Sequence, residues 1–136
     1  MTKEKFYQNK ETVYEIFTEL FNRLKEHPVL GPKLLATKLI MEIIISDSDA
    51  RFILDAFHKL PQLFLGKSDD APKPDVTIIM SSNTTHRFWL GQVNLPWAIL
   101  KKDVIVKGCV EKIFKVLPIL SPAFAIYRDI ISAYDT

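Results

Sequence analysis

The chain of 136 residues contains one cysteine, Cys109, so an internal disulfide framework is excluded. Small secreted domains commonly depend on disulfides, so a chain that cannot form an internal disulfide is more typical of a reducing compartment. Residues 1–5 also lack the apolar segment of a secretory signal peptide. We therefore expect a cytoplasmic protein, in which the sequon at Asn83 starts a helix and does not carry a glycan. Cys109 itself is interpreted as a small buried hydrophobe or, alternatively, as a thiolate stabilised at a helix start.

Long apolar runs and a strong charge imbalance are also missing. Although 48% of the residues are hydrophobic, none of the runs approaches the roughly 18–20 residues that span a bilayer. Eighteen basic and sixteen acidic residues give a net charge of +2, and the first 27 residues hold five of each sign. No basic arm of the nucleic-acid-binding type is present. The length predicts a single domain over residues 1–136 with one modest core.

Residues 87–115 depart from this balance. The segment contains two acidic residues, Asp103 and Glu111, and six basic ones, Arg87, Lys101, Lys102, Lys107, Lys112 and Lys115. A local charge of +4 can favour transient contact with an anionic membrane surface. A solvated rim without a partner is the alternative interpretation.

Catalytic and metal-binding motifs are lacking as well. The sequence has no nucleophile elbow, phosphate loop or dinucleotide fingerprint. His27, His58 and His86 lie far apart without a nearby cysteine, which argues against a zinc site. The aspartates of 47–49 and 69–70 lack the spaced ligands of a calcium loop and are typical of turns. The sequence thus predicts neither an enzyme nor a metal or other cofactor.

The apolar residues that are present first form a helical pattern over about residues 9–27. Asn9 or Thr12 can cap its start, and His27 with Pro28 ends it. Spacings of three and four residues put one apolar face on this helix: Val13, Ile16, Phe17, Leu20, Phe21 and Leu24. That face requires another element to pack against.

Five later segments have strand patterns. Residues 38–46 alternate, with Met41 and Ile43 on the apolar face, and a turn at 47–49 leads to a second strand at 51–57. Shorter strands are predicted at 63–65, 75–81 and 104–108. The first two segments are expected to form a hairpin, because the turn between them is short.

Helical patterns separate and follow these strands. Residues 81–84 start a helix that carries Phe88 and Trp89 and ends at Gly91, and a shorter helical segment covers 97–100. After the fifth strand, a helix is expected to stop at Pro118. Ser121 and Pro122 then start a last helix, about 121–134, with apolar residues on two sides. Such a helix has more apolar surface than one sheet face can cover.

The stretch around Met80 resembles the sterol carrier protein type-two (SCP-2-like) domain family. The resemblance rests on Pro-Asp-Val-Thr-Ile-Ile-Met-Ser at 74–81, on Gly-Gln-Val-Asn at 91–94 with Ala98, and on Val-Ile-Val-Lys-Gly at 104–108. These segments keep the family's register without a gap from Met80 onward. The order of elements also agrees from the first helix to Leu117.

Three features depart from the family pattern. Lys102 stands where a glycine usually opens the last strand. His86 and Arg87 are polar in a helix that is commonly more apolar. The segment from Pro118 onward is longer and more apolar than the usual tail, so the mouth of a cavity is expected to differ.

The resemblance implies an α+β fold: a five-stranded, mostly antiparallel sheet covered by helices, with an apolar tunnel between sheet and helices. It also implies non-catalytic binding of a sterol, fatty acid, fatty acyl-CoA or isoprenoid lipid, with transfer or presentation of that ligand. Some resembling domains are accessory factors of isoprenoid quinone synthesis, and others are appended to enzymes.

Nine apolar residues are the candidates for lining the cavity, although each fits an ordinary core as well. The last helix would act as a lid, and the basic rim would face a membrane or an acyl-CoA phosphate. The alternative hypothesis is an accessory module that docks on a partner enzyme of lipid or quinone metabolism, or dimerises, through that helix. The candidates are Met80, Phe88, Trp89, Trp97, Val110, Phe114, Leu117, Phe124 and Tyr127.

Overall fold

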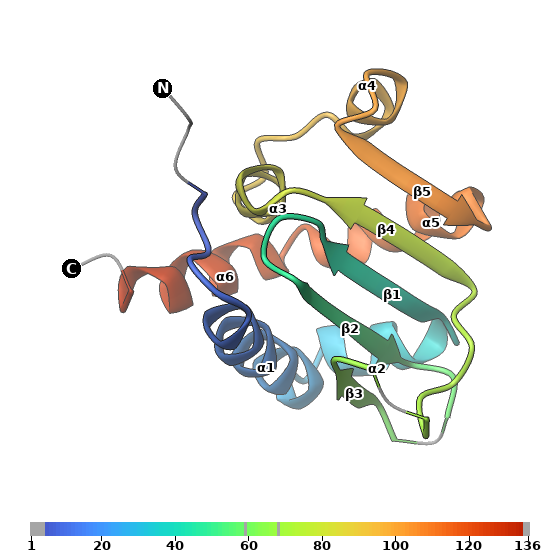
Figure 1. The fold of residues 1–136 in the computed structure, drawn as a ribbon. Helices are drawn as coiled ribbons and strands as arrows, with labels where there is room; N and C mark the ends of the chain where they lie inside the picture. Colours follow the sequence, from blue (N-terminus) through green and yellow to red (C-terminus); the bar gives the residue numbers. More distant parts are fainter. Residues whose placement is uncertain (1–4, 59, 68, 135–136) are drawn as a thin grey trace.

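A computed structural model describes residues 5–58, 60–67 and 69–134, and it has the predicted α+β fold (Figure 1). Its sheet has the strand order β3-β2-β1-β4-β5, in which β1 and β4 are parallel and the other pairs are antiparallel. In chain order the elements are α1 (Lys10–Glu26), α2 (Leu30–Ala36), β1 (Ile40–Ile45), β2 (Ala50–Asp55), β3 (Gln62–Leu65), β4 (Val76–Met80), α3 (Ser82–Trp89), α4 (Leu95–Leu100), β5 (Val104–Gly108), α5 (Val110–Leu120) and α6 (Ala123–Ser132).

The strand register separates an apolar inner face from an outer face. Ile43 lies opposite Phe52 and Ile78, and Ile78 lies opposite Val106, so these side chains share the inner face. Figure 1 shows α2, α5 and α6 behind the sheet, with α1 alongside α6. On the outer face, the carboxylate of Glu42 accepts hydrogen bonds from the Arg51 guanidinium and from Thr77.

Helix α1 begins as predicted. The side-chain oxygen of Asn9 accepts a hydrogen bond from the Thr12 amide at 2.9 Å, which satisfies a donor of the first turn. The six apolar residues that the spacing selected are all buried. Local periodicity therefore determined which face of this helix packs against the core.

Two predictions about the C-terminal helices were wrong. Helix α5 does not stop at Pro118 but continues to Leu120. Because proline has no N–H, Pro118 cannot donate to the carbonyl of Phe114, four residues earlier. Phe114 lies on the exposed side of α5, where water can solvate this carbonyl. Ser121 is the C-cap of α5 and does not cap α6, which begins at Ala123 without a side-chain cap.

The turn into β5 keeps a left-handed conformation although it lacks glycine. Lys102 has a φ of 66°, and its amide donates to the Ile99 carbonyl at the end of α4. At the other end of β5, Gly108 has a φ of 93°. Cys109 follows and is exposed, so its interpretation as a buried hydrophobe was wrong. None of the helices in the described part of the chain combines the length and hydropathy of a membrane-spanning segment.

Candidate functional site

A closed apolar cavity lies between the inner face of the sheet and helices α3, α4 and α5. The cavity has a volume of about 20 Å³. Titratable side chains are absent from the lining that the described residues form. The lining residues are Met41, Ile43, Ile78, Met80, Phe88, Trp89, Leu95, Ile113, Val116, Leu117 and Leu120.

This cavity is too small for a lipid in the conformation seen. A volume of about 20 Å³ accommodates a single water molecule. Pockets that hold small molecules usually have about 300–1,000 Å³. An apolar ligand can therefore enter only if one of the covering helices moves outward.

An open groove adjoins the closed cavity. It has a volume of about 470 Å³ and lies between the α3–α4 connection and the junction of α5 with α6. Phe88, Leu95 and Leu117 line both spaces, so these three side chains form the wall between them. The other groove residues are Gly91, Val93, Asn94, Pro96, Pro118, Ser121 and Phe124. The groove is open to solvent and is separated from the closed cavity by this wall.

Helix α5 covers the closed cavity. It supplies four lining residues, Ile113, Val116, Leu117 and Leu120, whereas none of the lining residues belongs to α6, the helix predicted as a lid. The apolar side of α6 is used elsewhere, because Tyr127, Ile130 and Ile131 are buried in the core.

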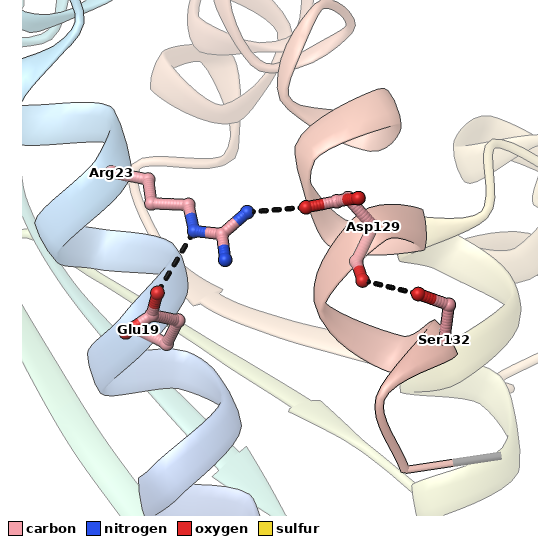
Figure 2. A network of polar contacts seen from close by, with 4 residues as sticks. All are labelled: Glu19, Arg23, Asp129 and Ser132. Atoms are coloured by element: carbon pink, nitrogen blue, oxygen red, sulfur yellow. Dashed lines mark hydrogen bonds and ion pairs between the residues drawn. The ribbon is translucent and has the colours of Figure 1, made fainter. Parts of the chain in front are cut away.

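Helix α6 is also held against α1 by charge. The Nη1 atom of Arg23 donates to Oδ2 of Asp129 at 2.6 Å, and its Nε donates to Oε1 of Glu19 at 2.9 Å (Figure 2). Within α6, Ser132 Oγ donates to the Asp129 carbonyl oxygen at 2.6 Å. These carboxylates raise the pKa of Arg23 above its usual value through hydrogen bonds, so the guanidinium stays charged. These contacts join α6 to α1 at the surface, and α5 has an ion pair of its own, with Lys112 Nζ 3.7 Å from Oδ1 of Asp75.

A buried polar cluster joins α6 to the N-terminal segment and α3. The hydroxyls of Tyr7 and Tyr127 lie 2.5 Å apart, and the Tyr127 hydroxyl is 2.8 Å from Nδ1 of His86. Phe6 stacks on the His86 ring with centroids 3.6 Å apart. Burial raises the pKa of both phenols well above the ordinary tyrosine value, and for Tyr7 the neighbouring Tyr127 adds to the shift. The cluster therefore joins the N-terminal segment, α3 and α6 beside the cavity, and its residues do not belong to the cavity lining.

The nine predicted site residues fall into three groups. Met80, Phe88, Trp89 and Leu117 line the closed cavity, and Phe124 lines the groove together with Phe88 and Leu117. Tyr127 is fully buried, with its ring 6.1 Å from that of Trp89, but it does not belong to either lining. The structure places the other three on the surface, with exposed fractions of 58% for Trp97, 41% for Phe114 and 37% for Val110.

Sequence reasoning missed seven lining residues: Met41, Ile43, Ile78, Leu95, Ile113, Val116 and Leu120. Alternation along 38–46 predicts that Met41 and Ile43 face inward, and the alternation of Val76, Ile78 and Met80 predicts the same for Ile78. Helical spacing from Ile113 also leads to Val116, Leu117 and Leu120, but an expected stop at Pro118 excluded the last turn. The helical spacing therefore indicates these residues, and the expected stop at Pro118 explains why Leu120 is not among the predicted ones.

A second open hollow, also of about 470 Å³, has a different character. Lys10, Arg51, Lys67 and Asp49 contribute to its lining, and Arg51 is already engaged by Glu42. It shares no lining residue with the closed cavity or the groove. This charged hollow is therefore not part of the apolar path.

Sequence and structure comparisons agree on the relatives of this fold. The SCP-2 domain of Helicoverpa armigera superposes with a TM-score of 0.64 at 15% identity, covering 92% of this chain and 96% of that one. The UbiJ-SCP2 ubiquinone synthesis protein gives 0.63 at 16% identity, covering 88% and 96%. Sterol carrier protein 2 of Aedes aegypti, solved with palmitate, gives 0.55 at 18%, covering 79% and 92%. At these identities, the likeness shows the shared fold.

The sec-alkylsulfatase Pisa1 from Pseudomonas sp. also contains this fold, with a TM-score of 0.52 at 20% identity; the match covers 62% of this chain but spans only 13% of the enzyme. Comparison with curated proteins gives no significant sequence match. The SCP-2 sterol transfer family, however, matches residues 17–121, which include every strand and the whole of α5. The predicted resemblance is thereby confirmed, and the chain belongs to the SCP-2 sterol transfer family.

Proposed function

We propose that the chain binds a hydrophobic ligand without chemical reaction and transfers or presents it. The observation that carries this proposal is the wholly apolar cavity that shares Phe88, Leu95 and Leu117 with an open groove. Family membership supports it, as does the palmitate bound by the Aedes aegypti relative. The candidate ligands are a sterol, a fatty acid, a fatty acyl-CoA or an isoprenoid lipid. A cytoplasmic location belongs to the same proposal, because the single thiol is free and exposed.

Apolar burial alone is sufficient for useful affinity. Covering about 400 Å² of ligand surface contributes about 10 kcal/mol before the losses of association. The groove is wide enough to hold part of a ligand, while the closed cavity must enlarge to accept the rest. Outward movement of α5 is the simplest way to enlarge it, since α5 supplies four of the seven helical lining residues and α6 supplies none.

Helix α4 is proposed as the element that meets a membrane. Trp97 and Leu100 expose 58% and 72% of their surface, and the exposed Lys101 and Lys102 follow them directly. Apolar side chains flanked by lysines suit an anionic lipid surface. The same helix carries Leu95 and Pro96 of the groove, so docking would bring the groove to the bilayer. Flotation with vesicles of anionic or zwitterionic lipid tests this, and equal binding to both would contradict it.

Competition with a fluorescent fatty acid probe tests ligand binding itself. The Ile113→Phe variant adds volume inside the cavity, and its affinity for the probe is expected to fall at least about tenfold. Ile119→Phe is the matched control, because Ile119 lies half-buried on the same helix but outside both linings. Thermal unfolding of both variants verifies that they fold. Failure of the unmodified protein to bind any lipid probe would refute the proposal.

The alternative of an accessory module remains a second candidate, because the UbiJ-SCP2 relative is a ubiquinone synthesis protein. Since Tyr127 and Ile130 of α6 are buried, deleting α6 would damage the core and could not isolate an interface. Substituting the exposed Ala125 and Arg128 with glutamate is a cleaner test. Loss of self-association or enzyme binding with lipid affinity retained would favour the module, and unchanged behaviour would argue against it.

A further inference from the structure

Trp89 lines the apolar cavity, and its indole nitrogen is a donor without a hydrogen-bond partner among the described residues. Trp89 is 4% exposed and lines the cavity from the end of α3. Its Nε1 atom is buried and has no hydrogen-bond partner among the residues that the structure describes. The Trp89 ring packs among aromatic rings: the centroids of Phe17, Phe124 and Tyr127 lie 5.9, 6.2 and 6.1 Å from its own.

Other buried side-chain donors and acceptors in the described part of the chain have hydrogen-bond partners, so the Trp89 indole is an exception. The hydroxyls of Ser48 and Ser82 lie 2.6 Å apart, and Tyr127 has two partners in Tyr7 and His86. Proteins rarely leave a buried N–H without an acceptor, because burial removes its bonds to water. The side chains of the described lining offer Trp89 no oxygen, since their heteroatoms beyond the indole are the thioether sulfurs of Met41 and Met80. An acceptor supplied from outside the chain would remove this cost.

We propose that the ligand of the cavity carries a neutral oxygen acceptor to which Trp89 Nε1 donates a hydrogen bond. This inference rests on the proposed function and narrows its ligand class. The acceptor is a carbonyl or hydroxyl oxygen on an otherwise apolar molecule. A carboxylate does not fit this position, because the described lining contains no cation and an unpaired buried charge is costly. A fatty acid would instead keep its carboxylate in the groove or in water.

Three probes of equal chain length separate these chemistries: hexadecanol, hexadecane and palmitate, each competing with a fluorescent lipid. Trp89→Phe keeps an aromatic ring and removes the donor, so it should weaken hexadecanol binding by about tenfold. Hexadecane and palmitate should keep their affinities to within about twofold, the loss expected from the slightly smaller ring alone. Tyr134→Phe, which also removes a donor from an aromatic side chain but at an exposed position outside both linings, should leave all three affinities unchanged. For each probe, the affinity of a variant is divided by that of the unmodified protein, so that differences in solubility between the probes cancel.

The two indole N–H resonances of the protein give an independent readout, with Trp97→Phe identifying the Trp89 signal. Hexadecanol should move the Trp89 proton downfield, and hexadecane should not. This measurement uses the unmodified protein and decides the question even if Trp89→Phe does not fold. Equal losses for all probes, or an indole signal that responds alike to alcohol and alkane, would overturn the inference while leaving lipid binding intact. Absence of binding by every probe would refute the proposed function instead.

Discussion

Both ends of β5 depend on a residue with left-handed backbone. Lys102 takes this conformation before the strand and Gly108 after it. Glycine accepts such angles freely, whereas a residue with a Cβ atom is strained by about 1–2 kcal/mol. Gly108 is further constrained because a Cβ atom there would lie 2.4 Å from the Asp75 carbonyl oxygen.

We predict that Gly108→Ala lowers the free energy of unfolding by about 3 kcal/mol, because it combines backbone strain with a clash against fixed backbone. Gly66→Ala is the control: Gly66 has a φ of 69°, but the nearest atom to its Cβ is the Tyr14 hydroxyl at 3.6 Å. That control should lose only about 1 kcal/mol. Urea unfolding of both variants measures the difference, and equal losses would contradict the role of the Asp75 contact.

Lys102→Gly should have the opposite sign. Relief of the left-handed strain outweighs the extra entropy that glycine has in the unfolded chain, so stability should rise by up to about 1 kcal/mol. The same unfolding experiment applies. A loss of stability would show that contacts of the lysine side chain matter more than its backbone angle.

At the scale of elements, α5 and α6 have different roles. Helix α5 covers the cavity and forms, through Leu117, part of the wall toward the groove. Helix α6 is fixed by Arg23 and by the buried hydroxyl of Tyr127. Ligand entry should therefore depend on α5, and resistance to alkaline unfolding on α6.

Shortening Leu117 should speed ligand entry. Leu117→Ala removes part of the wall between groove and cavity, so the association rate of a fluorescent lipid should increase several-fold. Phe114→Ala, on the exposed side of the same helix, should leave the rate unchanged. Stopped-flow mixing measures both rates. A rate that rises equally in both variants would point to general loosening of α5 instead of a gate at Leu117.

The phenols of Tyr7 and Tyr127 predict a loss of stability in alkali. Burial raises their pKa in the folded protein, while the unfolded chain ionises near the ordinary value of about 10. Their stabilisation is complete below about pH 10 and declines above it, by about 1.4 kcal/mol per pH unit for each phenol. Tyr7→Phe should make this decline shallower in urea unfolding between about pH 9 and 11. An identical slope in that variant would contradict the assignment.

For the whole molecule, features encoded within a few residues were predictable from the sequence. The buried face of α1 follows from Val13 to Leu24, and strands β1, β4 and β5 follow from their alternation. Features that depend on distant packing were not. Trp97 looks like a core residue by composition, but α4 buries Leu95 and Ala98 instead. Predicting the groove at Phe124 requires knowledge of where α6 runs, and predicting the small volume of the cavity requires knowledge of where α5 packs.

We propose that this compact core opens to hold one lipid. Native mass spectrometry of the protein purified without detergent tests it most directly, followed by extraction and identification of the released molecule. We predict a species heavier than the bare chain by one lipid, depleted in Ile113→Phe but kept in Ile119→Phe. A bare chain mass in every preparation, with no uptake of added lipid, would show that the core does not open for a lipid.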